Sequence, residues 1–142
     1  MDWQQELRGR ALAAPALTDL IEDRFDWVER PQGKPLPAVT AQTIDDARIQ
    51  NLKGFDSVQP ARVQLDVWGD DHATVRAVSE ALLAVLVPGH RGTHHTFARA
   101  IVNLGPRDLP ARDNTAGNSL PTTFRISMDL TFNHSPTEAA GS

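Results

Sequence analysis

The sequence predicts an α+β fold, in which an antiparallel or partly mixed sheet of about five strands packs against helices in the order α-β-β-β-α-β-β. Two observations carry this prediction. Residues 62–67 and 123–132 alternate apolar and polar side chains with the period of a half-buried strand. Between them, Val75, Val78 and Leu82 fall on one stripe of a helix. Alternating strands, rather than continuously apolar ones, favour antiparallel pairing with one wet face.

The first elements follow from proline and from β-branched residues. Residues 2–22 predict a helix in two pieces, because Pro15 is tolerated in a first turn but breaks a helix interior. Residues 24–29 alternate as a short strand, which the prolines and the glycine after it interrupt. Residues 38–44 predict a second strand, and the stretch at 45–60 is expected to be irregular.

The strand at 62–67 turns through Gly69 into the helix that ends near Pro88. Gly69 is able to take the positive φ that leaving a strand sometimes requires. Asp70 or Asp71 can cap the first helical turn, where acidic side chains also suit the helix dipole. We favour this role over a metal or acid–base pair, because the two carboxylates directly precede an apolar-periodic helix.

The second half contains two strands and a long excursion. The segment HRGTHH is predicted to be a loop, and residues 96–104 alternate as a strand. Residues 105–121 are so rich in Gly, Pro and Asx residues that irregular structure is expected over most of their length. Residues 123–132 form the most regular strand, and a small, polar, mobile tail is expected from about residue 134.

Length and composition favour one domain over residues 1–142. The formal net charge of −4, with Lys and Arg scattered among acids, argues against a dedicated nucleic-acid binder. The absence of cysteine excludes disulfides and thiolate sites. The N-terminus lacks the apolar segment of a signal peptide, and no apolar stretch approaches the roughly 20 residues that span a bilayer. We expect a soluble protein made in a cytoplasm, with no membrane partner.

No pattern indicates an enzyme, and no cofactor or metal is predicted. The phosphate-binding, nucleophile-elbow, zinc-protease and EF-hand spacings are all missing. His90, His94 and His95 are the one cluster that could ligate a metal, but no acid or cysteine in their loop completes a site. Trp3, Trp27 and Trp68 are more simply explained by core or interface packing, since no basic groove accompanies them.

Four phrases resemble the tail-terminator, or tail-completion, family of phages and their gene transfer agent relatives. They are ELRGRALAAPALTDLIEDRFDW, PLPAVTAQTI, RVQLDVWGDDHATVRAVSEALLAVL and FRISMDLTF. The third is the most diagnostic, because members share a strand ending in Val-Trp, an acidic or polar turn, and an Ala/Leu-rich helix. The resemblance covers most of the chain.

This resemblance implies a structural, non-enzymatic virion protein at the head–tail junction, made in the cytoplasm of the bacterial host. It implies an α+β subunit that forms a hexameric ring, stacks on the last ring of the tail-tube protein, and meets a head-side connector or stopper protein. DNA would pass through the ring without specific binding, which an acidic subunit suits because a cationic lining would hold phosphates. The family offers no catalytic residues to transfer.

A ring also requires two different complementary patches on each subunit. The two long segments between strands are the candidates, because loops of more than about 12 to 15 residues are usually functional or disordered. We expect inter-subunit or partner contacts at Arg48, Lys53, Phe55, Arg107, Asp108, Arg112 and Asp113.

Two alternatives remain open from the sequence. A head-closure or connector protein also forms rings, and the residues distinguish it poorly from a terminator. A small metal- or ligand-binding α+β domain would use the loop that holds His90, His94 and His95.

Overall fold

The computed structural model describes residues 2–31, 33, 35–55, 57–110 and 123–137, with the backbone but not the side chain of Phe55. The helices are α1 (Trp3–Leu12), α2 (Pro15–Ile21) and α3 (His72–Leu86). The strands are β1 (Phe25–Trp27), β2 (Ala38–Asp46), β3 (Gln50–Asn51), β4 (Gly54–Phe55), β5 (Gln59–Gly69), β6 (His90–Arg91), β7 (His95–Phe97), β8 (Ile101–Pro110) and β9 (Phe124–Pro136).

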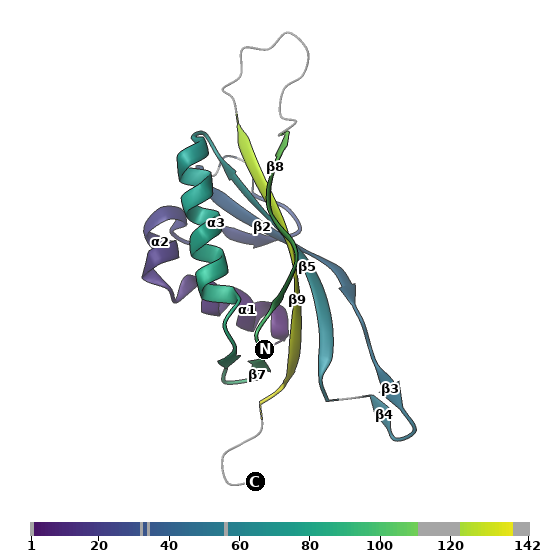
Figure 1. Cartoon of the computed structure of the whole chain (residues 1–142). Helices are drawn as coiled ribbons and strands as arrows, with labels where there is room; N and C mark the ends of the chain where they lie inside the picture. Colours follow the sequence, from purple (N-terminus) through teal and green to yellow (C-terminus); the bar gives the residue numbers. More distant parts are fainter. Residues whose placement is uncertain (1, 32, 34, 56, 111–122, 138–142) are drawn as a thin grey trace.

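Seven of these strands form one curled sheet, in the order β1-β2-β5-β9-β7-β6, with β8 also paired to β9 (Figure 1). The pairing of β1 with β2 is parallel and the others are antiparallel, so the sheet is mixed. The long strand β9 serves two neighbours along one edge, since Thr96 of β7 pairs with Ser135 and Pro110 of β8 pairs with Phe124. Strands β3 and β4 form a separate hairpin that projects beyond the ends of β2 and β5.

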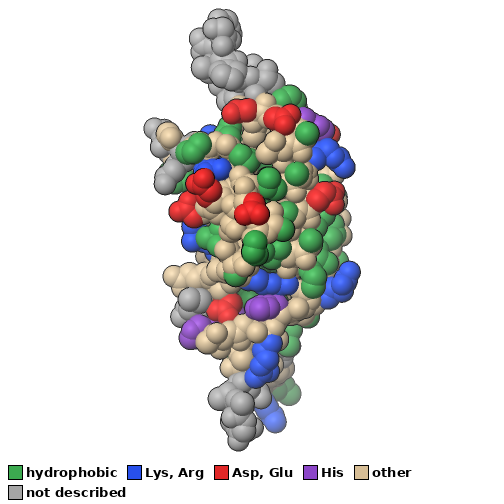
Figure 2. Space-filling view, turned by 90° about the vertical axis from the view of Figure 1, so that its left-hand side faces the viewer, with side chains coloured by type: hydrophobic (Ala, Val, Ile, Leu, Met, Phe, Trp, Pro, Cys, Tyr) green, Lys and Arg blue, Asp and Glu red, His purple; other side chains and the backbone are tan. Residues whose placement is uncertain are grey.

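The helices cover one face of the sheet, and the hydrophobic core lies between the two layers. Every second residue of β2, β5 and β9 points to this core, as the alternation predicts. On the outer side of the helical layer, acidic and basic side chains are interspersed rather than gathered into a patch (Figure 2). The largest fully buried side chains are Leu7, Leu17, Ile21, Phe25, Leu65, Leu82, Leu86, Phe97, Ile126, Met128, Leu130 and Phe132.

The helix starts show how local chemistry sets the boundaries. Asp2 caps α1 through a hydrogen bond of 2.8 Å from the backbone N–H of Gln5, and α2 begins at Pro15. Asp71 is the N-cap residue of α3, but its carboxylate accepts a hydrogen bond from the Thr74 hydroxyl instead of a backbone amide. The cap position was therefore predicted correctly and its hydrogen bond was not.

Gly69 is needed for space rather than for a positive φ. A Cβ atom at this position would lie 2.5 Å from the Cγ2 atom of Val75, and the positive-φ glycines of the described residues are Gly33 and Gly54. The close approach follows from the tight turn between β5 and α3, which brings the first helical turn against the strand end.

The hairpin formed by β6 and β7 is tied to α1 by a buried glutamate. The backbone N–H of His94 donates to Oε1 of Glu6 at 3.1 Å, and a side chain at Gly92 would collide with the same carboxylate. Burial acts to raise the pKa of Glu6, but hydrogen bonds from the backbone of His94 and His95, together with the charges of these two histidines, outweigh it and lower that pKa. The glutamate therefore holds the hairpin as an anion.

The α+β class is confirmed, whereas the number and order of strands differ from the prediction. The segment at 45–60 is not irregular, because it contains the ends of β2 and β5 and the β3–β4 hairpin. The strand expected at 96–104 is two strands, β7 and β8, separated by residues 98–100. Part of HRGTHH also pairs, as β6 and the start of β7.

Residues 105–110 form the second half of β8, although a loop was expected there. Pro106 is tolerated because β8 lies at an edge, where a missing N–H costs little. The remainder of the predicted excursion, 111–121, lies outside the described residues. The tail expected from about residue 134 is wrong for residues 134–137, since His134 is buried in β9 and Thr137 donates its N–H to His94 O at 2.9 Å.

None of the helices in the described part of the chain is both long and apolar enough to cross a membrane.

Candidate functional site

Three of the predicted contact residues lie at the β3–β4 hairpin. Arg48 is exposed and its Nη2 atom lies 2.9 Å from Oδ2 of Asp46. Lys53 is exposed in the hairpin turn, where its N–H donates to Oδ1 of Asn51 at 2.8 Å. The backbone of Phe55 pairs with Gln50. The hairpin carries Lys53 away from the sheet, whereas Arg48 stays beside the end of β2 through its contact with Asp46.

Two more predicted contact residues lie on β8, at the edge beside β9. Arg107 pairs in register with Ser127, and its side chain is exposed. Oδ1 of Asp108 lies 2.9 Å from Nε2 of His72, with both side chains substantially exposed. Such a surface pair contributes at most about 1 kcal/mol. Arg112 and Asp113 lie outside the described residues, so their role stays a prediction.

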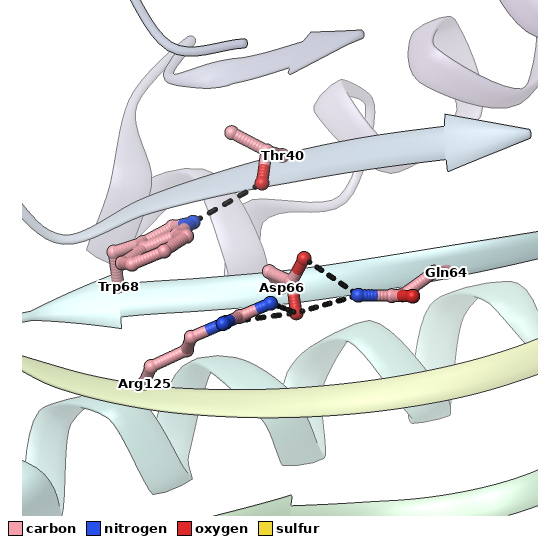
Figure 3. Close-up of polar contacts among 5 residues, drawn as sticks. All are labelled: Thr40, Gln64, Asp66, Trp68 and Arg125. Atoms are coloured by element: carbon pink, nitrogen blue, oxygen red, sulfur yellow. Dashed lines mark hydrogen bonds and ion pairs between the residues drawn. The ribbon is translucent and has the colours of Figure 1, made fainter. Parts of the chain in front are cut away.

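The sheet face opposite the helices carries paired charges at its centre. The guanidinium of Arg125 donates to Oδ1 of Asp66 at 3.2 and 3.3 Å, and it lies 4.9 Å from the centre of the Trp68 ring. The amide of Gln64 also donates to Asp66, while the Trp68 indole N–H donates to the Thr40 hydroxyl at 3.1 Å (Figure 3). Asp66 is only 7% exposed. A nearly buried carboxylate is thus fully engaged by its neighbours on the sheet.

A second pair, Arg62 and Asp129, extends this arrangement one pleat further along the sheet. Nε of Arg62 lies 2.9 Å from both carboxylate oxygens, and the Asn103 amide donates to Oδ1 at 3.0 Å. Burial acts to raise the pKa of Asp129, but the hydrogen bonds from Arg62 and Asn103, together with the charges of Arg62 and Arg107, outweigh it and lower that pKa. We call the outward residues Thr40, Arg62, Gln64, Asp66, Trp68, Arg125 and Asp129 the polar face.

An aromatic cluster lies at the end of the sheet where α1 meets β9. The rings of Trp3 and His134 stack with centroids 5.1 Å apart, and the His95 ring lies 5.9 Å from His134. All three line an open cavity of about 550 Å³, together with Arg48 and other residues. His134 is 5% exposed, and its Nε2 atom has no hydrogen-bond partner among the described residues.

Burial lowers the pKa of His134 more than the nearby Asp46 carboxylate raises it, and the charges of His95 and Arg48 act in the same direction as burial. The unfolded chain, with a His pKa near 6.5, therefore takes up this proton first as the pH falls. The contribution of His134 to the free energy of unfolding is fully present above about pH 6.5. It is lost as the pH falls from there through the folded-state pKa, with a slope of at most about 1.4 kcal/mol per pH unit.

His134→Phe is expected to remove this part of the pH dependence, because the ring still stacks on Trp3 but cannot titrate. Urea unfolding at a series of pH values between about 7.5 and 5 measures it. His90→Gln, at an exposed position, serves as the matched control and should keep the wild-type slope. Equal slopes for the two variants would contradict the assignment.

The histidine cluster proposed as an alternative metal site does not gather in the structure. Among the residues that the structure describes, no three His, Asp or Glu side chains lie close enough together to hold a metal ion. His90 and His94 are exposed on the β6–β7 hairpin, whereas His95 turns toward His134.

Two features of the site could not be predicted from the sequence, namely the pairing of charges within the polar face and the contact between Trp3 and His134. The alternation of β5 and β9 showed that Asp66 and Arg125 lie on wet faces, but their pairing depends on the register between two strands about 60 residues apart. Trp3 was expected in a core or interface, and at 6% exposure it belongs to the core. Its partner His134 was expected in the mobile tail, so nothing in the sequence indicated that the two residues are in contact.

The chain is similar to a known protein family and to two solved structures. The chain matches the family of tail completion protein gp17 over residues 5–128. Its fold is similar to a chain in the solved structure of the virion of a native gene transfer agent particle, with a TM-score of 0.69 and 16% identity over 94% of each chain. A second solved structure is similar at a TM-score of 0.52 and 14% identity, over 96% of this chain and 92% of the other. The comparison with curated proteins gave no match.

The family match covers most of the chain and includes every phrase on which the sequence resemblance rested, except the end of the last strand. The solved structure of the virion shows that a similar fold occurs in an assembled particle. The chain belongs to the tail completion protein gp17 family and is a structural protein of a phage or gene transfer agent tail.

Proposed function

We propose that the chain is a tail terminator, of which six copies form a ring that caps the tail tube and joins it to a head-side connector. The observation that carries this proposal is the free edge of β8. This strand has ten residues, none of them buried, and β9 is its single strand neighbour among the described residues. Natural sheets shorten, charge or cover such edges, so a long edge with aliphatic side chains is expected where another chain covers it.

The polar face is suited to line a channel through which DNA passes without specific binding. Arg62 and Arg125 are each held by a carboxylate of the same face. A cation that is already paired gains little from a phosphate, and phosphate neutralisation supplies most of non-specific DNA binding. The net charge of −4 acts in the same direction.

Family membership supports the partners that the ring would have. A protein that completes a tail has to meet the tail-tube protein on one side and a head-side connector or stopper protein on the other. The hairpin residues Arg48 and Lys53 and the β8 residues Arg107 and Asp108 are available at the surface for these contacts or for contacts between copies.

The mass of the purified wild-type chain tests the ring. Native mass spectrometry and negative-stain electron microscopy are expected to show rings with six times the monomer mass. A chain that stays monomeric up to millimolar concentration would refute the proposal. A reconstruction of the particle separates a terminator from a head-closure protein, since density between the last tube ring and the connector supports the first and density on the head side of the connector supports the second.

A further inference from the structure

The exposed aliphatic side chains of this subunit occur in two separate places. Among the described residues, the helices expose no large hydrophobic side chain, and all those that are exposed lie on strands or on the segments that join them. One group follows the outer edge of β2 and the β3–β4 hairpin, and we call it the hairpin edge: Val28, Ile44, Ile49, Leu52 and Val58. The other group lies in the first half of β8, and we call it the β8 patch: Ile101, Val102 and Leu104.

The hairpin edge is built by local irregularities of the sheet. The parallel strand β1 covers β2 only as far as Ala41, so within the described part of the chain residues 42–46 have β5 as their one strand neighbour. A register shift between Thr43 and Asp45 leaves Ile44 without a partner on β5, at 45% exposure. The hairpin then carries Leu52 outward, where this side chain is completely exposed.

The β8 patch lies at the other edge of the same sheet. Ile101 pairs with Thr131 and Val102 with Leu130, and a further register shift separates Val102 from Leu104. Across the sheet at this level lie β9, β5 and then β2, so the two groups are separated by the full width of these strands. The free N–H and C=O groups on the outer side of β8 add hydrogen-bonding capacity to the apolar patch.

The area of the two groups fits an interface of ordinary size. From the exposed fractions, the eight residues together present on the order of 800 Å² of surface. If about 60% of an interface is apolar, this surface corresponds to roughly 1,300 Å² of total buried area, which lies within the range of stable protein–protein contacts.

We propose that the hairpin edge of one copy packs against the β8 patch of the next copy, and that this single heterologous contact, repeated, closes the ring. The inference rests on the proposed function and names the surfaces that meet. Two different patches at opposite edges of one sheet are what a head-to-tail contact requires, whereas a two-fold contact would need one self-complementary patch. One kind of partner, a second copy of this chain, then covers both groups.

Leu52→Lys and Ile101→Lys test the contact from its two sides. Lys on an edge is a device by which natural sheets prevent pairing, and both positions are exposed, so the subunit should remain folded by circular dichroism and thermal unfolding. Each variant is expected to lose roughly tenfold or more of its affinity at every contact in the ring and to run as a monomer. Ala84→Lys, at an exposed position of α3, is the matched control and should form wild-type rings.

A mixture of the two variants separates a heterologous contact from a two-fold one. The Leu52→Lys chain keeps an intact β8 patch and the Ile101→Lys chain keeps an intact hairpin edge, so one productive contact remains between them. The mixture should form a dimer and nothing larger. In a two-fold arrangement each variant alone would instead keep dimers through its unchanged patch, and mixing would add no species.

The outcomes distinguish this inference from the proposed function. If both single variants still form rings of wild-type mass, or if their mixture stays monomeric, the assignment of these two surfaces is wrong. The proposal that the wild-type chain forms a ring would be unaffected by either result. A monomeric wild-type chain would instead refute the ring itself. If Ile101→Lys fails to fold, Leu104→Lys tests the same patch.

Discussion

Arg125→Met is expected to lower the free energy of unfolding by about 2 to 3 kcal/mol, because it leaves the nearly buried Asp66 carboxylate without its cation. Of its donors among the described residues, the Asp66 carboxylate would keep only the amide of Gln64, and Trp68 would lose the guanidinium beside its ring. Urea unfolding at neutral pH measures the loss, with Arg76→Met on the exposed face of α3 as the matched control, expected to change stability by less than about 0.5 kcal/mol.

The double variant Arg125→Met with Asp66→Leu should recover most of the loss, since a buried ion pair replaced as a whole by apolar side chains is often neutral in stability. Additive losses in the double variant would show that the two residues act independently and that the pair does not exist in solution.

Phe132→Ala is expected to cost more, about 3 to 5 kcal/mol, because it removes a fully buried ring from the centre of the core. The ring packs edge-to-face on Phe97, with centroids 6.3 Å apart. For a domain of this size the midpoint of thermal unfolding should fall by roughly 10 °C or more. Phe132→Leu is the graded control, and its smaller loss would reflect the volume retained. A loss below about 1 kcal/mol for the alanine variant would mean that the ring is not in a packed core.

The sequence predicted helix α3 and strand β9 best, because the spacing of their apolar residues follows from which side of each element is buried. Helix α3 and strand β9 each bury one side against the sheet or the helices, so apolar residues recur at the required spacing. Strand β8 has no buried residue, and although the alternation at 96–104 reaches into its first half, residues 105–110 carry no alternation that separates them from a loop. The pairing with β9 decides its structure, and that information lies about 20 residues further along the chain.

For the same reason the sequence predicts the exposure of some candidate contact residues, while their contacts stay a prediction. Charged residues such as Arg48 and Arg107 mark a wet surface, and the structure does place them at two different edges. The aliphatic residues beside them, Leu52 and Ile101 among them, look like ordinary core residues in the sequence. Only the register of the sheet shows that they are exposed.

The contact between Trp3 and His134 joins the first helix to the end of the last strand. Both ends of the described chain therefore leave the subunit at one pole, while the facing ends of β8 and β9, at Pro110 and Phe124, lie at the other. The subunit has a built-in axial polarity. In the proposed ring, all copies would share this direction, so the two rims would expose different residues. The tail tube and the connector would then each bind a different rim.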